Sequence, residues 1–249
     1  MSIELSPRLQ QVADWVPRQA HLVDVGTDHA LLPIYLMQAD RIVKAVASDV
    51  RAGPVQRARR NVARHGLEDR IAVRQGYGLS IVQPGEVDTI TLAGLGGQLA
   101  TEILEHDFAV VERVTSVITQ PMGGVWLVRR FFYERQWQIE RETVVSDSGY
   151  TYMVIEFRPG TGLDPAYAPF TGQEIALTAA FEFGPHLLLH PNAAWYDYVQ
   201  DKLTRWQRAA TGMATSSRQE VGERRAQMMD ACQWLANWLQ QLEKGAGAP

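Results

Sequence analysis

Short apolar runs alternate with amphipathic stretches along the chain up to residue 158. The runs rich in Val, Ile and Leu predict buried strands at 21–25, 43–49, 71–75, 87–92 and 116–119. Apolar residues at helical spacing predict helices at 7–16, 31–39, 54–65, 97–105 and 125–135. Strands separated by helices of this length are typical of parallel βαβ units, so we expect an open α/β sheet.

Two further extended runs, at 140–145 and 150–158, follow the last of these helices. The short segment Ser146-Asp-Ser-Gly149 separates them and has the composition of a turn. We therefore expect an antiparallel hairpin that closes the sheet.

The pattern changes after residue 158. Pro and Gly interrupt it at 159–162 and 165–169, which predicts a linker, and everything beyond about residue 171 has helical periodicity. Apolar residues at steps of three, four and seven predict two helices joined by 214–217, paired as an antiparallel, coiled-coil-like hairpin. Their apolar positions are Trp195, Val199, Leu203, Trp206, Ala210 and Met213, then Val221, Met228, Cys232, Leu235, Leu239 and Leu242. The predicted domains are 1–160 and 161–249.

Composition narrows the class of protein only slightly. The chain has 249 residues, 46% of them hydrophobic, and a net charge of −4, which does not suggest a dedicated nucleic-acid-binding domain. The single cysteine excludes an internal disulfide and a thiolate metal cluster. No apolar segment has the length of a signal peptide or a membrane span. We expect a cytoplasmic protein with no metal.

Candidate chemistry follows the predicted strands, because an open parallel sheet binds ligands beyond the carboxyl ends of its strands. The first strand is followed by Asp24-Val-Gly26-Thr27-Asp28-His29, in which Gly26 permits a tight turn. This is not the G-x-G-x-x-G pattern that a dinucleotide's pyrophosphate needs. An adenosyl cofactor without phosphates tolerates Thr27 and the acidic Asp28.

The next three strands also end in residues that can contact a nucleotide. Asp49 ends the second strand, where a carboxylate can accept hydrogen bonds from both ribose hydroxyls. Gly76-Tyr77-Gly78 ends the third strand and can bring backbone and an aromatic face to an adenine. Ala93-Gly94-Leu95-Gly96-Gly97 ends the fourth. Together these turns predict a nucleotide-like ligand.

Five segments of the chain resemble the bacterial TrmK family of tRNA (adenine(22)-N(1))-methyltransferases. They are Asp-His-Ala-x-Leu-Pro at 28–33, Gly53-Pro54, Arg74-Gln-Gly-x-Gly78, Ala93-Gly-x-Gly-Gly97 and Gln120-Pro121, and the similarity extends from Ser6-Pro-Arg-Leu to Gly184-Pro185 and the helical tail. The resemblance implies a Rossmann-like class I methyltransferase fold followed by a C-terminal coiled-coil domain. It also implies methyl transfer from S-adenosylmethionine to N1 of an adenine in tRNA, with S-adenosylhomocysteine as the product. Two positions depart from the family: Tyr77 stands where it usually has Asp, and Met122 where it commonly has Asn.

The expected roles follow from the motifs and the resemblance. The expected cofactor-binding residues are Asp24, Gly26, Thr27, Asp28, His29, Asp49, Val50, Gly76, Tyr77, Gly78, Ala93, Gly94, Leu95 and Gly96. Asp28 and His29 are the candidate catalytic residues, because a carboxylate or imidazole can take up a proton or stabilise a cationic product. The alternative is that Asp28 only caps the next helix. Expected tRNA contacts are Gln120, Pro121 and Met122 at the target base, and Arg57, Arg60, Arg64, Arg129 and Arg130 at phosphates.

Two other functions remain open at this stage. The acidic total charge also suits a methyltransferase acting on a small molecule or a protein, with the helical hairpin as a lid or dimer element. Tyr77 suits an inactive relative that binds tRNA or adenosine. The oligomeric state is open between a monomer and a weak dimer.

Overall fold

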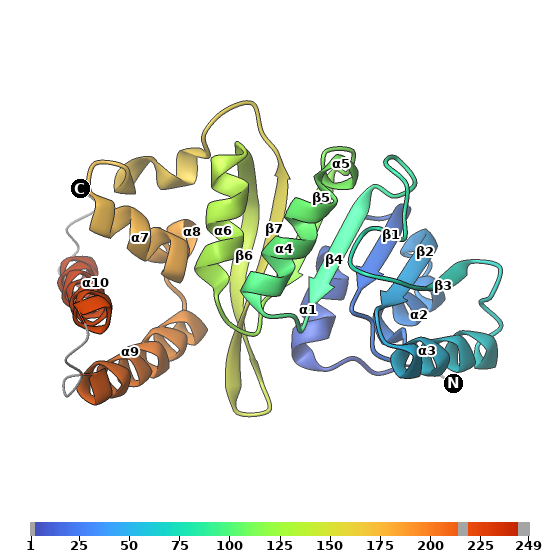
Figure 1. The fold of residues 1–249 in the computed structure, drawn as a ribbon, viewed down its shortest axis with the longest axis horizontal. Helices are drawn as coiled ribbons and strands as arrows, with labels where there is room; N and C mark the ends of the chain where they lie inside the picture. The colour runs from blue at the N-terminus through green and yellow to red at the C-terminus, as the bar shows by residue number, and fades with distance from the viewer. Residues whose placement is uncertain (1–2, 214–218, 244–249) are drawn as a thin grey trace. The chain divides into compact units, whose positions relative to one another are not determined.

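The computed structural model describes residues 3–213 and 219–243, and its first part is built on a single sheet. The strands are β1 (Ala20–Val25), β2 (Ile42–Asp49), β3 (Ile71–Gln75), β4 (Thr89–Ala93), β5 (Ser116–Gln120), β6 (Trp137–Asp147) and β7 (Tyr150–Pro159). They lie in the order β3-β2-β1-β4-β5-β7-β6. The first five are parallel, and β7 is antiparallel to both β5 and β6 (Figure 1). The expected Rossmann-like sheet, closed by an antiparallel hairpin, is confirmed.

Six helices connect these strands or precede them. They are α1 (Pro7–Trp15), α2 (Leu31–Gln38), α3 (Ala52–Arg64), α4 (Gly97–His106), α5 (Phe108–Val111) and α6 (Val125–Glu134). One apolar cluster joins α1, α2 and α3 to the sheet, through buried residues such as Val12, Leu36 and Val62. Helices α4 and α6 pack on each other and lie side by side in front of the sheet in Figure 1.

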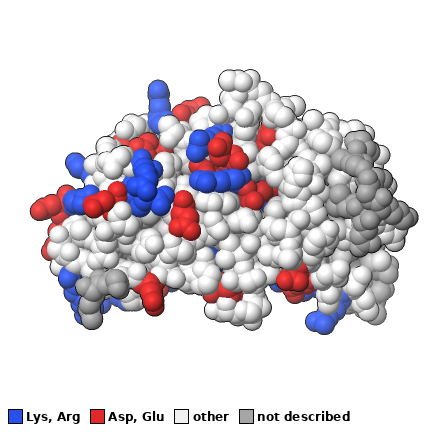
Figure 2. Space-filling view, turned by 180° about the vertical axis from the view of Figure 1, so that it is seen from behind, with Lys and Arg blue, Asp and Glu red and all other residues white. Residues whose placement is uncertain are grey.

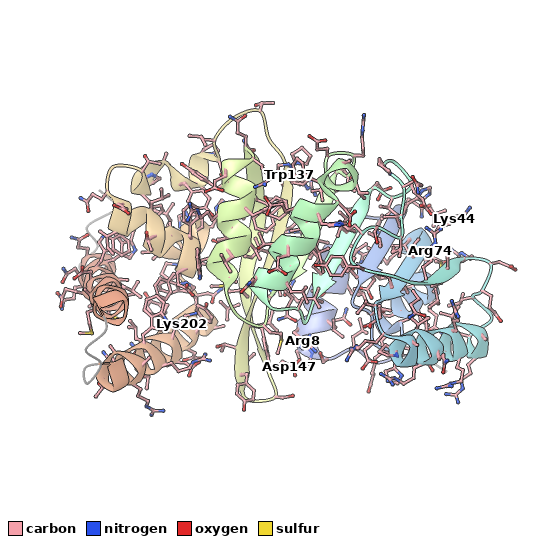
Figure 3. The ribbon with its side chains drawn as sticks, in the orientation of Figure 1. Arg8, Lys44, Arg74, Trp137, Asp147 and Lys202 are labelled. Atoms are coloured by element: carbon pink, nitrogen blue, oxygen red, sulfur yellow. The ribbon has the colours of Figure 1, made fainter. Side chains whose placement is uncertain are left out.

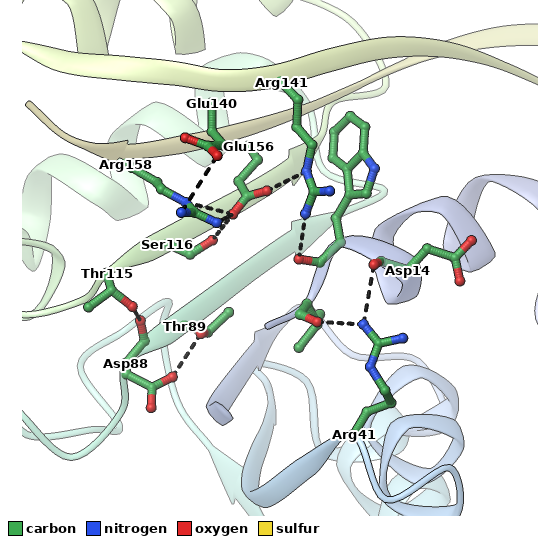
Figure 4. A network of polar contacts seen from close by, with 12 residues as sticks. Asp14, Arg41, Asp88, Thr89, Thr115, Ser116, Glu140, Arg141, Glu156 and Arg158 are labelled. Carbon is green, nitrogen blue, oxygen red and sulfur yellow. Dashed lines mark hydrogen bonds and ion pairs between the residues drawn. The ribbon is translucent and has the colours of Figure 1, made fainter. Parts of the chain in front are cut away.

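The end of α1 is tied to the sheet by two arginines that bond its last carbonyls. Arg141 of β6 donates to the Trp15 carbonyl at 3.1 Å and lies 4.9 Å from the Trp15 ring centroid. Arg41 donates to the carbonyls of Asp14 and Val16 (Figure 4). These carbonyls have no partner within the helix, so the arginines satisfy them and hold α1 in place.

Arg141 is itself held by a buried acid. Its Nε lies 2.6 Å from Oε2 of Glu156, a fully buried residue of β7 that also accepts from Ser116 and Arg158. A buried carboxylate is tolerated only when its oxygens are paired. The network shown in Figure 4 therefore connects α1 to β5, β6 and β7.

The first residue of α4 lies against the loop that precedes α6. The Gly97 N–H donates to the Gly123 carbonyl at 2.7 Å. A side chain at Gly97 would overlap the carbonyl oxygen of Gly124, so only glycine fits there. The loops that precede these two helices are consequently held together.

The chain divides between Leu163 and Asp164 into two compact units. The second contains the 3-10 helix η1 (Pro165–Phe170), α7 (Glu174–Phe183), α8 (Pro185–Leu189), α9 (Ala193–Met213) and α10 (Gln219–Glu243). Trp195 of α9 donates to the Phe183 carbonyl, and Trp238 of α10 donates to the Leu188 carbonyl. Both indole rings are buried, so these tryptophans are core residues, and α9 contacts α10.

The coiled-coil pairing of α9 and α10 stays a prediction. Residues 214–217, expected to join the two helices, and the side chains of Met213, Val221, Met228 and Leu242 lie outside the described part of the chain. Among the described positions of the expected seam, Trp195 donates its indole N–H to the Phe183 carbonyl of α7.

Most predicted elements in the first unit are present with shifted ends. Strand β4 begins at Thr89, two residues late, and β6 begins at Trp137, three residues early. Two short helices were not predicted: α5, and η1 within the expected linker. The η1 turn forms because the Asp164 carboxylate accepts the N–H of Ala166 at 2.9 Å, a local cap that apolar periodicity does not indicate.

Replacement of Gly97 by alanine tests the close approach of α4 and α6. We expect Gly97→Ala to lower the free energy of unfolding by about 1–3 kcal/mol, because the new methyl group forces the two helices apart. Gly96→Ala is the matched control: nothing lies within 4 Å of a side chain there. It should change stability by about 0.5 kcal/mol or less. Equal effects in urea unfolding would contradict the packing described here.

Candidate active site at the carboxyl edge of the sheet

The loops that follow β1 and β4 open side by side, because these two strands are hydrogen-bonded neighbours that point the same way. Val25 of β1 pairs with Leu92 of β4. The chain leaves β1 toward β2 on one side, and β4 continues to β5 on the other. This reversal of strand order is where open α/β sheets bind ligands.

Asp24 is a buried acid beneath the first loop. It is 6% exposed and accepts a hydrogen bond from the Thr91 hydroxyl at 2.9 Å. Burial raises its pKa to about 6, although the hydrogen bonds from Thr27 and Thr91 act in the opposite direction. Asp24 is therefore a buried acceptor that binds a proton more readily than an ordinary aspartate.

The glycine turn after β1 lies against the turn after β4. Gly26 has a φ of +74°, and a side chain there would come within 3.0 Å of Leu95. The next residue, Thr27, is buried and donates its N–H to the Ser48 carbonyl at 2.8 Å. Two expected site segments, 24–27 and 94–96, are thus brought together.

Asp28 and His29 stand at the exposed end of the first loop. The Asp28 side chain is 65% exposed, with His29 Nε2 at 3.4 Å and Arg57 Nη2 at 3.2 Å from its Oδ1. His29 and Ala30 both have positive φ, 65° and 53°. Such backbone is costly for residues with side chains and is kept only where the surrounding structure enforces it. Helix α2 has Ala30 at its N-cap with no side-chain cap, so Asp28 does not cap it.

Asp49 lies at the end of β2, as expected, and is 6% exposed. Its Oδ1 accepts from the Arg51 N–H at 2.8 Å and from Arg51 Nε at 3.3 Å. The Gly76 N–H donates to the Asp49 carbonyl, which joins the second and third loops. Val50, beside Asp49, is 58% exposed and presents an apolar surface at this edge.

The third loop packs on α4. A side chain at Gly78, whose φ is +53°, would come within 2.8 Å of Ile103. Tyr77 is 39% exposed, and its ring meets His106 edge to face at 5.7 Å. The aromatic face expected at this position is therefore present, and part of it is open to solvent.

Gln120 ties the fourth loop to the loop after β5. Its Oε1 accepts from the Gly94 N–H at 3.2 Å, and its own carbonyl accepts from the same N–H at 3.0 Å. The Met122 N–H donates to the Leu95 carbonyl. Gln120 is fully buried and Pro121 is buried, whereas Met122 is 52% exposed. Of the three residues expected to meet the target base, only Met122 is open to it.

Four of the five arginines expected to contact phosphate have side chains that are at least partly exposed. Arg60 and Arg64 are exposed on α3, as a phosphate contact requires. Arg57 lies on the same helix, but its Nη2 pairs with Asp28. Arg130 is exposed and pairs with Glu134 one turn along α6.

The expectation that Arg129 contacts phosphate is wrong. Arg129 is fully buried, and its Nη2 lies 2.7 Å from Oε2 of Glu142 on β6, which is equally buried. A guanidinium in this position joins α6 to the sheet and does not reach the surface. The spacing of charges did not show this, because the partner lies on a different element.

Three residues near the site were not among the expected ones. Arg51 bonds Asp49, while Arg8 of α1 donates to Gln120 Oε1 at 2.7 Å and lies 3.5 Å from Asp147 Oδ2. Arg8 and Asp147 lie together at the lower edge of the sheet in Figure 3. The only signal for Arg8 was its place in the segment Ser6-Pro-Arg-Leu.

Within the described residues, no three or more His, Cys, Asp and Glu side chains gather as a metal site would require. No helix in this part of the chain is long and apolar enough to cross a membrane.

Comparison with known proteins identifies the fold and then the family. Residues 5–155 match the model of a methyltransferase domain, so the sheet and its glycine-lined edge define a methyltransferase. The chain is 35% identical to tRNA (adenine(22)-N(1))-methyltransferase of Bacillus subtilis over 193 residues, 78% of this chain and 79% of the relative. It belongs to the tRNA (adenine(22)-N(1))-methyltransferase family, TrmK.

Solved structures agree with this assignment. The crystal structure of B. subtilis TrmK superposes with a TM-score of 0.83 at 30% identity, covering 95% of this chain and 99% of the other. M. capricolum TrmK, solved with S-adenosylhomocysteine, gives a TM-score of 0.74 at 25% identity and covers 92% of this chain and 98% of the other.

The pKa of Asp24 predicts a pH-dependent stability. The folded-state pKa is raised, so the folded protein binds a proton more tightly than the unfolded chain between about pH 4 and pH 6. Stability from this group is therefore lost as the pH rises through that window. Asp24→Asn has no carboxyl group to ionise and so does not lose this stability. We expect the free energy of unfolding of the variant, relative to wild type, to rise by about 2–3 kcal/mol from pH 4 to pH 7. Urea unfolding at both pH values measures it. A constant difference between the proteins would contradict the raised pKa.

The buried pair of Arg129 and Glu142 predicts a large loss of stability when Arg129, which the sequence suggested as a phosphate contact, is replaced. We expect Arg129→Ala to lower the free energy of unfolding by about 3–5 kcal/mol, because it removes the guanidinium that pairs with the buried carboxylate of Glu142. Arg130→Ala is the control: it removes an exposed pair worth about 0.5 kcal/mol. If urea unfolding shows both variants equally stable, the structural role of Arg129 is refuted.

Proposed function

We propose that this protein transfers a methyl group from S-adenosylmethionine to N1 of adenine 22 in tRNA. The observation that carries the proposal is the close contact of the Gly26 turn with the turn at 94–96, beside Asp49, in a chain 35% identical to an enzyme of that activity. An adenosyl cofactor supplies an electrophilic methyl group at this edge of the sheet.

The residues at the edge fit an adenosyl cofactor. The carboxylate of Asp49 suits the two ribose hydroxyls, because its hydrogen bonds to Arg51 involve only one of its oxygens, Oδ1. Asp24 and the backbone of the glycine turns suit the methionine part of the cofactor, with its amino and carboxylate groups. Exposed apolar surface at Val50 and Tyr77 suits the adenine. In this proposal Thr27, Gly76, Gly78, Ala93 and Leu95 shape the walls.

Tyr77 in place of the family's usual acid does not argue against this fit. Its ring is anchored against His106 and retains 39% exposure, so it can pack on an adenine while the backbone of the same loop meets the polar edge. Aromatic contact of this kind stabilises by about 0.5–1.5 kcal/mol beyond the area buried.

Asp28 and His29 are our candidates for managing the proton of the adenine amine. Methylation at N1 leaves a positive charge on the ring, which a nearby carboxylate stabilises or relieves by accepting a proton. Asp28 is exposed at the edge, and Arg57 and His29 hold its Oδ1 side. Positioning of the base against the methyl donor supplies most of the rate, with no covalent intermediate on the protein.

The target base has to leave the tRNA stack to reach this edge. We propose that Met122, 52% exposed beside the Gly94 turn, contacts the extruded base. Arg60, Arg64 and Arg130 are the accessible candidates for phosphate contacts. On the face shown in Figure 2, basic and acidic side chains are mixed, so we expect local contacts and not a broad basic surface.

We assign the cofactor and the reaction to the first unit, which contains the whole methyltransferase match at 5–155. A tRNA-modifying activity of this kind places the protein in the cytoplasm.

The decisive assay measures transfer of labelled methyl groups to an unmodified tRNA transcript, followed by mapping of the modified base. The proposal expects label at adenine 22, and none in a transcript with guanine at that position. Transfer only to small molecules or proteins would contradict it, as would tRNA binding without transfer.

Asp28→Asn tests the proposed proton acceptor. We expect turnover on tRNA to fall by about 100-fold or more, because the amide is neutral and is not a base. The affinity for S-adenosylhomocysteine and the melting temperature should stay close to wild type. Asp69→Asn, an exposed acid just before β3 and far along the sheet from the site, is the control. Near-wild-type turnover of the Asp28 variant would remove this residue from catalysis.

A further inference from the structure

Arg8, at the carboxyl edge of the sheet, has N–H donors that make no hydrogen bond to any described residue. Its guanidinium has five N–H donors, of which Nη1 serves Gln120 and Nε faces Asp147. Within the described residues Nη2 makes no hydrogen bond, and 26% of the side chain is exposed. Arg8 is thus held by two partners and keeps N–H donors that neither of them uses.

The partners of Arg8 come from three separate elements. Arg8 belongs to the first turn of α1, Gln120 ends β5, and Asp147 ends β6 at the tip of the hairpin. Figure 3 shows Arg8 and Asp147 together between α1 and this hairpin. The Tyr152 ring of β7 adds a cation–π contact at 5.8 Å. Because these contacts already fix the orientation of the Arg8 guanidinium, Arg8 loses little side-chain freedom when a ligand binds to it.

The guanidinium lies over the turn that faces the proposed cofactor. A side chain built on Gly94 would lie 3.7 Å from Arg8 Nη1. The oxygen of Gln120 that accepts from Arg8 also accepts from the Gly94 N–H. Arg8 therefore lies beside the Gly94 turn with part of its side chain exposed, whereas Gln120 is fully buried.

We propose that Arg8 binds the phosphate next to the target nucleotide and that Gln120 and Asp147 position it. This inference rests on the proposed function. An extruded nucleotide brings its flanking phosphates to the carboxyl edge of the sheet, where Arg8 lies. A planar guanidinium with free N–H groups matches a phosphate in charge and geometry. Asp147 Oδ2 lies 3.5 Å from Nε, on the edge that Nε shares with one N–H of Nη2, so the acid holds the arginine while the second N–H of Nη2 stays available to a phosphate.

The test compares Arg8→Ala with wild type on an unmodified tRNA transcript. We expect the KM for tRNA to rise by about tenfold or more, with unchanged affinity for S-adenosylhomocysteine. The slope of log K for tRNA against log salt concentration should become shallower by about 0.7–1, the signature of one lost phosphate contact. A purely structural arginine would not change that slope.

Arg18→Ala is the matched control, because Arg18 is exposed on the same terminal segment but lies before β1, at the opposite edge of the sheet. It should leave KM and slope unchanged. If Arg8→Ala does not fold, Arg8→Gln, which keeps part of the aliphatic stem, is measured in its place. A wild-type slope and KM in the folded Arg8 variant would overturn the inference alone. Failure of the wild-type protein to methylate the transcript would overturn the proposed function and the inference with it.

Discussion

The parallel pairing of β1 with β4 is the constraint on which the rest of this structure depends. It places Val25 opposite Leu92, so the two glycine turns that follow leave the sheet at the same height. The Gly26 turn can then contact Leu95, and the Met122 N–H can bond the carbonyl of Leu95 from the next strand along. One register between two strands thus brings together segments far apart in sequence.

The edge of the sheet is built mainly from backbone contacts between loops and is stiffened by buried ion pairs. Gly97 permits α4 to meet the loop before α6, and Arg129 with Glu142 fixes α6 on β6. Helix α1 carries Arg8 in its first turn, and at its other end Arg41 and Arg141 donate hydrogen bonds to its last carbonyls. Helix α1 is consequently held at both ends, which keeps Arg8 at a constant position over the Gly94 turn.

Much of this arrangement could be predicted from the sequence because it depends on local pattern. Apolar runs located every strand, and the glycine turns and Asp49 were expected at the edge where they lie. Periodicity could not predict the pairing of Arg8 with Gln120, 112 residues apart, or of Arg129 with Glu142. Arg129 shares the buried side of α6 with Val125, Val128 and Phe132, so a stricter count along the helix would have indicated its burial.

The central claim is that the β1–β4 edge binds S-adenosylmethionine. A crystal structure of this protein with S-adenosylhomocysteine tests it most directly. Our account predicts the ligand between the Gly26 and Gly94 turns, with its ribose hydroxyls on the Asp49 carboxylate and its adenine beside Tyr77. Density for the ligand elsewhere, with Asp49 bonded only to Arg51, would contradict it.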